Sequence, residues 1–443
     1  MFPSVNAKAD FREKATKNIT YELDNEGFQE RLRGALKNVF VRDRKLNLKQ
    51  LIFFIMTAKS ALQRDLDRFF KTINGEDFNI RAVTKGGFSK SRRKLDPWAF
   101  QRLNDVAVNS FYQHADFTIW GDYRVLAVDG SRLVLPNHAS VKEEFGEHMF
   151  GPKADSKRSM ACCSILYDVF NHLTLDAQIA PYTASEVSLL ESHFDKMNSC
   201  DLLLADRGYP SFWLLFLLKA KGIEFCIRLK EDWWLKVKDF TQSDELEREV
   251  VFSLPKKDRK KLDAYPHYQD ATITCRLIKV ILDDGSKEIL CTSLLDTKKY
   301  PYQEFIELYH YRWGVEEAYK LLKVRAELED FSGKTAIAVK QDFFAKIFLM
   351  SLCAIYAYPI EEKVREEYKA DHERKHSQQI NHTHALSMTQ DILIGVFLKN
   401  QFQKAIQAFD QVVEKTREII RPRRTIVRNK KPKKPYAMAY KKL

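Results

Sequence analysis

Two adjacent glutamates, Glu316 and Glu317, lie in the segment YHYRWGVEEAYKLLK. At about 100° per residue, a helix places Glu316 on one arc with Tyr309, Arg312 and Lys323, beside an apolar stripe. Glu317 points about 100° away and has the position of a solvated surface charge. An ordinary helix with ion pairs spaced by four residues explains the same pattern, at about 0.2–0.5 kcal/mol per pair. The helix alone favours that ordinary interpretation, so the rest of the chain must decide whether Glu316 does chemistry.

Two aspartates follow apolar runs that predict strands. YRVLAVDGSRLVLP is expected to form a strand that ends at Asp129, a turn at Gly130 and a second extended run. In CDLLLADRGYP, the buried strand is expected to stop at Asp206. Polar residues at the carboxyl ends of strands in an open α/β sheet converge on one edge. Together with Glu316 these carboxylates would suit magnesium, and two ions roughly 3.5–4 Å apart stabilise both oxygens of a phosphoryl displacement.

The first 115 residues are predicted to be helical. KQLIFFIMTAKSALQRDLDRFF shows helical periodicity, and Pro97 stands near the start of a second helix. Between them, TKGGFSKSRRK has five basic residues and no acid, and its two glycines indicate a loop. This segment either contacts the DNA backbone through Lys90, Arg92 and Arg93 or is a solvated loop, and the sequence supports both interpretations equally.

The middle of the chain alternates strands and helices. MACCSILYDVFNHLTLDAQIA predicts two strands, TASEVSLLESHFDKM a helix capped by Thr183 or Ser185, and SFWLLFLLKAKG a helix closed by Gly222. IEFCIRLK predicts another strand. Strand-like runs dominate residues 232–299, where DDGS is a hairpin turn. Helices return in the opening segment and in AVKQDFFAKIFLMSLCAIYA.

Composition and charge indicate a globular protein with a polyanionic partner. The 443 residues are 45% hydrophobic and carry a net charge of +13. Residues 417–443 hold 11 Lys/Arg against one acid, Glu418. Such a basic tail favours nucleic acid first and an acidic membrane second, although a solvated tail is equally consistent with charge alone.

The cysteines and the N-terminus favour a cytosolic protein without a structural metal. None of the seven cysteines forms a CxxC or zinc-like spacing, which favours reduced, buried thiols. MFPSVNAKADFREK has no signal-peptide apolar region. The longest apolar run, Ile347–Ile360, is too short to span a bilayer and predicts a core helix. The histidines form only chance pairs such as His382 and His384.

At these residues the chain resembles DDE transposases of bacterial insertion sequences, in the insertion-sequence-four family. The resemblance rests on AVDGSRLVLP around Asp129 and LLLADRGYP around Asp206. It also rests on a Tyr-x2-Arg-x3-Glu-x6-Lys signature, which is met by Tyr309, Arg312, Glu316 and Lys323. The resemblance covers about residues 40–430. One Asp-Gly pair is weak support, whereas the full signature with two correctly ordered aspartates is specific.

The resemblance implies an α/β fold, with a ribonuclease H-like catalytic core interrupted by a β-rich insertion. Helical N-terminal and C-terminal regions flank that core. The expected parts are a helical DNA-binding region (1–115), the first part of the core (116–231), the insertion (232–300), the second part with the catalytic helix (301–375), and a C-terminal helical region with the basic tail (376–443).

The resemblance also implies an activity. Asp129, Asp206 and Glu316 would bind two Mg²⁺ ions, with Mn²⁺ able to substitute, and water would nick each transposon end to leave a 3′-hydroxyl. Related enzymes form a hairpin that is reopened before insertion. Tyr309, Arg312 and Lys323 would contact phosphates near the cleaved end. The partners would be terminal inverted repeats, target DNA and a second copy in a synaptic homodimer, at the nucleoid in the bacterial cytoplasm and without a membrane.

Three tryptophans have open assignments. Some relatives stack a flipped base on a tryptophan of the insertion, but Trp233 and Trp234 do not match that position well, and both base stacking and core packing fit them. Trp313 either lines the DNA path or packs in the core.

Two other functions compete with an active transposase. One is an inactive or domesticated DNA-binding relic, against which the intact Asp129, Asp206 and Glu316 argue. The other is a related metal-dependent nuclease without strand transfer.

Removal of Glu316 is expected to relieve repulsion from the aspartates and to raise the stability of the metal-free protein slightly.

Overall fold

The computed structural model describes residues 5–33, 40, 45–59, 61–79, 81–150, 156–282, 285–371 and 376–420. These residues form a mixed α/β protein that divides into two compact units. The helical unit comprises Met1–Phe117, Arg132–Ala161 and Tyr319–Leu443. The sheet unit comprises Thr118–Ser131 and Cys162–Ala318. The five-part division expected from the sequence remains a prediction.

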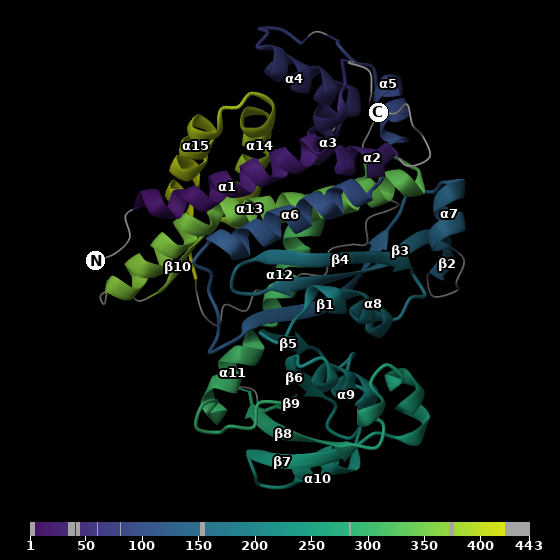
Figure 1. Ribbon diagram of the computed structural model, residues 1–443, viewed down its shortest axis with the longest axis vertical. Helices are drawn as coiled ribbons and strands as arrows, with labels where there is room; N and C mark the ends of the chain where they lie inside the picture. The colour runs from purple at the N-terminus through teal and green to yellow at the C-terminus, as the bar shows by residue number, and fades with distance from the viewer. Residues whose placement is uncertain are drawn as a thin grey trace. The chain divides into compact units, whose positions relative to one another are not determined.

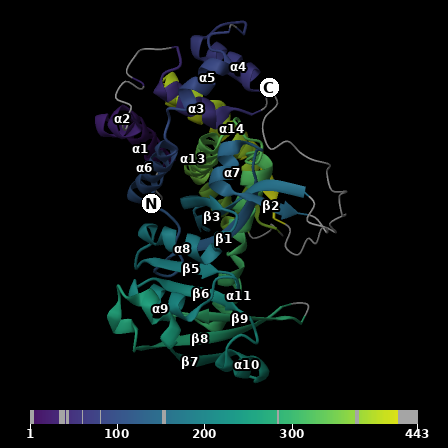
Figure 2. The ribbon, with the colours of Figure 1, turned by 90° about the vertical axis from the view of Figure 1, so that its right-hand side faces the viewer.

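A nine-stranded mixed sheet has the order β2-β3-β1-β5-β6-β9-β8-β7, and β4 pairs with β3 (Figures 1 and 2). The strands are β1 (Arg124–Val134), β2 (Glu147–Phe150), β3 (Ser156–Asp168), β4 (Leu173–Pro181), β5 (Asp201–Ala205), β6 (Glu224–Leu229), β7 (Glu247–Ser253), β8 (Thr272–Ile281) and β9 (Lys287–Thr292). β1, β5 and β6 are parallel, whereas β6, β9, β8 and β7 are antiparallel. The β-rich segment after β6 therefore extends the same sheet.

The helices of the sheet unit are α8 (Glu186–His193), α9 (Phe212–Ala220), α10 (Leu235–Gln242), α11 (Tyr302–His310) and the start of α12 (Trp313–Lys320). Every residue of β5 is buried, as expected for a parallel strand covered on both faces. The apolar helix α9 packs against β6. Ser185 caps α8, and Gly222 adopts φ +71° after α9, as the sequence predicts.

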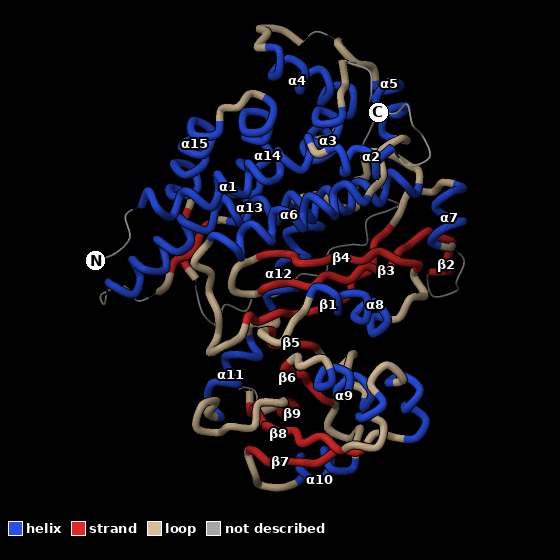
Figure 3. The backbone as a smooth tube through the Cα atoms, in the orientation of Figure 1, coloured by secondary structure: helices blue, strands red, loops and turns tan. Residues whose placement is uncertain are grey.

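The helical unit is built around one long helix, α13 (Ala336–Ala370), which contacts α1, α3, α6, α14 and α15 (Figure 3). The other helices are α1 (Val5–Asp24), α2 (Glu26–Arg33), α3 (Leu48–Thr57), α4 (Leu62–Asn74), α5 (Lys85–Arg92), α6 (Trp98–His114), α7 (Ala139–Phe145), α14 (His382–Leu393) and α15 (Phe402–Lys415). The short strands β10 (Gln378–Ile380) and β11 (Arg417–Ile419) pair with each other. By length and composition alone α13 resembles a membrane span, but its apolar window is 94% buried inside the protein. This burial fits the predicted core helix.

Two local predictions are wrong. β1 continues through Gly130 without a turn, because this glycine stays within the strand. TKGGFSKSRRK contains helix α5 rather than a loop, and Thr84 Oγ1 accepts from Gly87 N at its start. The apolar segment after Asn47 splits into α3 and α4, and residues 232–299 include α10 among their strands. Neither β2 nor α7 was predicted from the sequence. The basic residues 421–443 and the two aspartates of DDGS lie outside the described residues.

Candidate active site

Asp129 lies on β1, two residues beyond Ala127, where the pairing of β1 with β5 ends. It is half-buried, and its Oδ1 accepts a 2.9 Å hydrogen bond from Gly130 N. Burial raises the pKa of Asp129 to about 6; the charges of Glu316 and Glu186 act in the same direction, whereas Gly130 N–H and Arg312 oppose them. Burial is thus the main cause of the raised pKa, and the two neighbouring glutamates add to it.

Asp206 directly follows β5, as the sequence predicts. Tyr309 Oη donates weakly to Asp206 Oδ1 and to Ala205 O, both at 3.5 Å. Burial raises the pKa of Tyr309 well above its usual range, so the phenol remains protonated and is a donor at neutral pH. The first residue of the signature is thus a partner of the second aspartate.

Arg312 and Glu316 form a hydrogen-bonded ion pair, with Arg312 Nη2 2.9 Å from Glu316 Oε1. The arginine side chain is only 4% exposed and the glutamate 33%, so one charge is buried while the other opens to solvent. Arg312 Cζ also lies 4.7 Å from the ring centroid of the exposed Trp313. Arg312 Nε is buried and has no hydrogen-bond partner among the described residues.

The signature segment is not one regular helix. α11 ends at His310 and α12 begins at Trp313. At the junction, Arg312 N donates to Tyr309 O at 3.1 Å, a bond between residues three apart rather than the four of an α-helix. Lys323 lies in a π-helical turn, Leu321–Arg325, and belongs to the helical unit, where its Nζ donates to Arg132 O at 2.6 Å. A constant 100° per residue therefore fails across this segment. The sheet unit brings Tyr309, Arg312 and Glu316 together with the two aspartates, but Lys323 is not part of it.

Two residues of this site were not predicted from the sequence. Glu186 is the first residue of α8, and a Cβ placed on Gly130 would lie 2.7 Å from Glu186 Oε1, so a larger residue at 130 would displace the Glu186 side chain. Tyr209 is 1% exposed, and its hydroxyl has no partner among the described residues. Burial raises the pKa of Tyr209 well above its usual range, and Asp129, Glu186 and Asp206 add to that increase. The segment DRGYP, which follows a predicted strand, could have drawn attention to Tyr209. The only sequence signal for Glu186 was its place as an acid in a first helical turn.

The three predicted carboxylates are spread apart. Across the described ranges, Asp129, Asp206 and Glu316 do not form a set whose ligand oxygens all lie within 4.8 Å of one another. A single ion with one tight coordination shell would need a closer set, whereas two ions require ligands that span both. The donor atoms are carboxylate oxygens, which suit Mg²⁺ and Mn²⁺.

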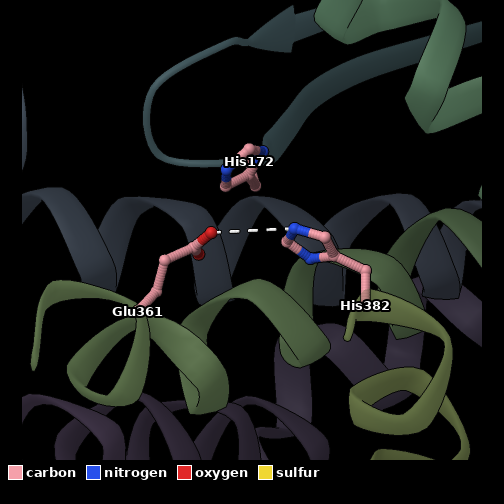
Figure 4. A group of neighbouring side chains, drawn as sticks. All are labelled: His172, Glu361 and His382. Carbon is pink, nitrogen blue, oxygen red and sulfur yellow. Dashed lines mark ion pairs between the residues drawn. The ribbon is translucent and has the colours of Figure 1, made fainter. Parts of the chain in front are cut away.

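His382, which the sequence pairs with His384 only by chance, lies near a glutamate of another helix. His382 Nε2 lies 3.7 Å from Glu361 Oε1 within the helical unit (Figure 4). His172, drawn in the same view, belongs to the sheet unit, where its Nδ1 is 3.0 Å from Tyr167 Oη. Neither observation gives His384 a role as a ligand.

Arg92, one of the predicted DNA contacts, is buried in the helical unit rather than open to solvent. Its side chain is 4% exposed and pairs with Asp342 Oδ1 at 2.9 Å, while its Nε donates to Gln341 Oε1 at 2.9 Å. These bonds fix α5 against α13 inside the helical unit. Lys90 and Arg93 are exposed and remain predicted contacts.

We expect Arg92→Met to lower the free energy of unfolding by about 3–5 kcal/mol, because it leaves the buried Asp342 without its cation. The neighbouring exposed Arg93→Met is the matched control and should change stability by less than about 0.5 kcal/mol. Urea unfolding measures both. Unchanged stability in Arg92→Met with weakened DNA binding would instead restore the predicted contact.

A basic cavity of about 260 Å³ lies in the sheet unit and includes Arg207, the residue after Asp206, in its lining. It is lined by Arg207, Arg228, Leu229, Lys230, Glu231, Asp232 and Lys287. Lys230 Nζ lies 5.0 Å from the ring centroid of Trp233, which is 45% exposed. Trp234 instead stacks on Phe212, with centroids 4.1 Å apart. The two adjacent tryptophans therefore differ: Trp234 packs, and Trp233 is open to solvent.

The site thus combines two aspartates near the ends of parallel strands with a helical glutamate, a buried arginine that pairs with the glutamate, and a tyrosine that donates to Asp206. The sequence profile of the transposase DDE domain family matches residues 120–353, more than half of the chain. The chain therefore belongs to this family. The predicted kinship with DDE transposases of bacterial insertion sequences is confirmed.

Individual relatives agree with this family. The transposase InsG for insertion sequence element IS4 of Escherichia coli K12 is 24% identical over 297 residues, which cover 64% of this chain and 63% of InsG. The presumed transposase InsZ of the same strain is 21% identical over 186 residues, 41% of this chain and 60% of InsZ. The chain thus spans about three fifths of these relatives. A solved structure of a piggyBac transposase synaptic complex with hairpin DNA aligns with a TM-score of 0.45 at 10% identity. The alignment covers 91% of this chain and 85% of the piggyBac chain.

Proposed function

We propose that the protein is an active transposase of an insertion sequence, which cleaves the ends of its element and joins the 3′-hydroxyl ends to target DNA. The observation that carries the proposal is the gathering of Asp129, Asp206 and Glu316 in one unit, each linked to other residues of the site. Family membership supports the same activity. An inactive DNA-binding relative and a nuclease without strand transfer are the alternatives.

The residues fit a pair of divalent cations. The site offers hard carboxylate oxygens, together with the buried hydroxyl of Tyr209, which has no partner among the described residues. Asp129, Asp206 and Glu316 would hold the ions. When bound, two such ions supply an activated water and stabilise the leaving oxygen of the displacement.

The remaining residues position these carboxylates and the DNA. Arg312 holds Glu316 in place, and Tyr309 donates to Asp206. The unpartnered Nε of Arg312 supports a contact with a phosphate oxygen near the cleaved end. Lys323, Trp313, Lys90 and Arg93 are proposed as further DNA contacts. The basic cavity lined by Arg207 and Lys230, with Lys230 over the ring of the exposed Trp233, would receive a phosphate and an adjacent base.

The ribonuclease H-like core is also proposed. Its support is the strand order β4-β3-β1-β5-β6, with parallel β1, β5 and β6 and a helix before and after β5. The β-rich insertion would then be the antiparallel extension β9-β8-β7. The terminal inverted repeats and target DNA are the proposed partners, a homodimer is the proposed synaptic form, and the proposed location is the bacterial cytoplasm.

Cleavage should require a divalent cation. With DNA carrying the element's own ends, we expect nicking and joining in Mg²⁺ or Mn²⁺, little cutting in Ca²⁺, and none in excess chelator. Gel analysis of both strands separates cleavage from joining. Undiminished cleavage in chelator would refute the metal mechanism, and cleavage without joining would favour the nuclease.

The basic tail should strengthen DNA binding without specificity. Residues 421–443 contain ten Lys/Arg and no acid, whereas Arg417 lies in β11 and pairs with Glu367. Deletion after residue 420 should therefore weaken binding to any DNA and make its salt dependence shallower. The logarithmic slope should fall by about 0.9 for each DNA phosphate that the tail neutralises in the full chain. Titrations at several salt concentrations measure the slope, and an unchanged slope would show that the tail serves another purpose.

A further inference from the structure

Glu186 extends the acidic face formed by Asp129 and Asp206. Its Oε1 lies 2.7 Å from the Cβ position of Gly130, and its Oε2 lies 3.7 Å from that of Gly208. These glycines follow the two aspartates by one and two residues. The Glu186 carboxylate thus lies over the backbone next to both acids.

A structural role at the start of α8 does not explain this placement. An acid in a first turn gains about 0.3–1 kcal/mol from the helix dipole wherever its side chain points. The cap is already supplied by Ser185, whose Oγ accepts from Val187 N at 3.3 Å. Among the described residues, Glu186 has no hydrogen-bond or ion-pair partner, although it is half-buried. The Glu186 carboxylate is therefore free of competing cations from the described residues and can accept a metal ion.

The hydroxyl of Tyr209 is an independent sign of a ligand at the same place. It is buried and unpartnered, and Asp129, Glu186 and Asp206 all act on it electrostatically. Buried hydroxyls nearly always have a hydrogen-bond partner. A phenol can bond to water held by a cation, and magnesium usually retains several of its waters.

We propose that Glu186 is a fourth carboxylate of the divalent-cation site and holds an ion directly or through its water shell. This inference rests on the proposed function. With Glu186, four carboxylates and the Arg312 guanidinium leave three negative charges. That charge balances two divalent cations carrying one bound phosphodiester, whereas the three predicted acids alone would leave the assembly positive.

The test is a titration of the full chain with Mn²⁺ in the absence of DNA. Calorimetry measures the binding, and the electron paramagnetic resonance signal of free Mn²⁺ gives the number of bound ions. Glu186→Gln should lose one bound ion or weaken its binding at least tenfold, and Glu186→Asp should retain part of the affinity. Glu191→Gln, an exposed acid on the same helix, is the matched control and should bind within twofold of wild type. Circular dichroism and thermal midpoints confirm that each variant is folded.

Asp129→Asn and Glu316→Gln in the same titration separate the two proposals. If both lose Mn²⁺ while Glu186→Gln and Glu186→Asp bind as wild type does, the fourth carboxylate is refuted and the metal mechanism stands. If wild type binds no Mn²⁺, or if no variant changes binding, both proposals fail.

Discussion

Glu316→Gln is expected to reduce strand cleavage at least a thousandfold while leaving folding and end binding intact. Glutamine keeps an oxygen that can accept from Arg312 Nη2 but removes the charge that would hold a cation. Glu317→Gln should keep most activity, because Glu317 is exposed on the next position of α12. Cleavage of the same end-containing DNA in Mg²⁺ measures both variants.

This comparison also tests the helix phase. An inactive Glu317→Gln with an active Glu316→Gln would show that the signature has been assigned to the wrong glutamate. Alanine is a poorer choice at Glu316, because it leaves the buried Arg312 guanidinium without its carboxylate. The pair with Arg312 opposes the predicted gain in stability from removing Glu316, because the loss of the carboxylate leaves the buried guanidinium without its partner.

The sequence located the carboxylates because their signals are local. Asp206 ends a fully apolar run, and Glu316 stands at fixed spacing from Arg312, so neither depended on tertiary structure. Asp129 was found for a partly wrong reason, since β1 continues past it. Its place at the edge arises because pairing with β5 stops at Ala127. That end of pairing depends on the length of another strand, which no local pattern encodes.

Burial and long-range partners caused the failures. Arg92 belongs to a basic run that resembles its neighbours in sequence, yet its partner Asp342 is 250 residues away. Glu186 and Gly130 approach each other across 56 positions, and each alone has an ordinary local explanation. A helical wheel at 100° per residue placed Lys323 on the same face as Glu316, but the π-helical turn Leu321–Arg325 changes the angle between successive residues. Side-chain packing, rather than propensity, decides each of these cases.

Asp129→Asn should abolish cleavage, yet make the metal-free protein more stable above about pH 6. Burial raises the pKa of Asp129 from 3.8 to about 6, so the folded state binds a proton more tightly than the unfolded state. Ionisation therefore destabilises the wild type as pH rises through about 6, and asparagine avoids that cost. The pKa difference corresponds to at most about 3 kcal/mol, and partial exposure of the site makes about 1–3 kcal/mol the expected gain.

Urea unfolding in chelator at pH 7.5 and pH 4.5 measures this effect. The advantage of Asp129→Asn should be full at pH 7.5 and should fall to about a third of that value at pH 4.5. At pH 4.5 the folded wild-type carboxyl is protonated, whereas the unfolded one, with its pKa of 3.8, is still mostly ionised. Added Mg²⁺ should reverse the order, since an ion that binds only the folded wild type stabilises it by mass action. Equal stability of the two proteins at pH 7.5, with or without Mg²⁺, would mean that Asp129 carries neither the unbalanced charge nor the cation, and the proposed chemistry would lose its first ligand.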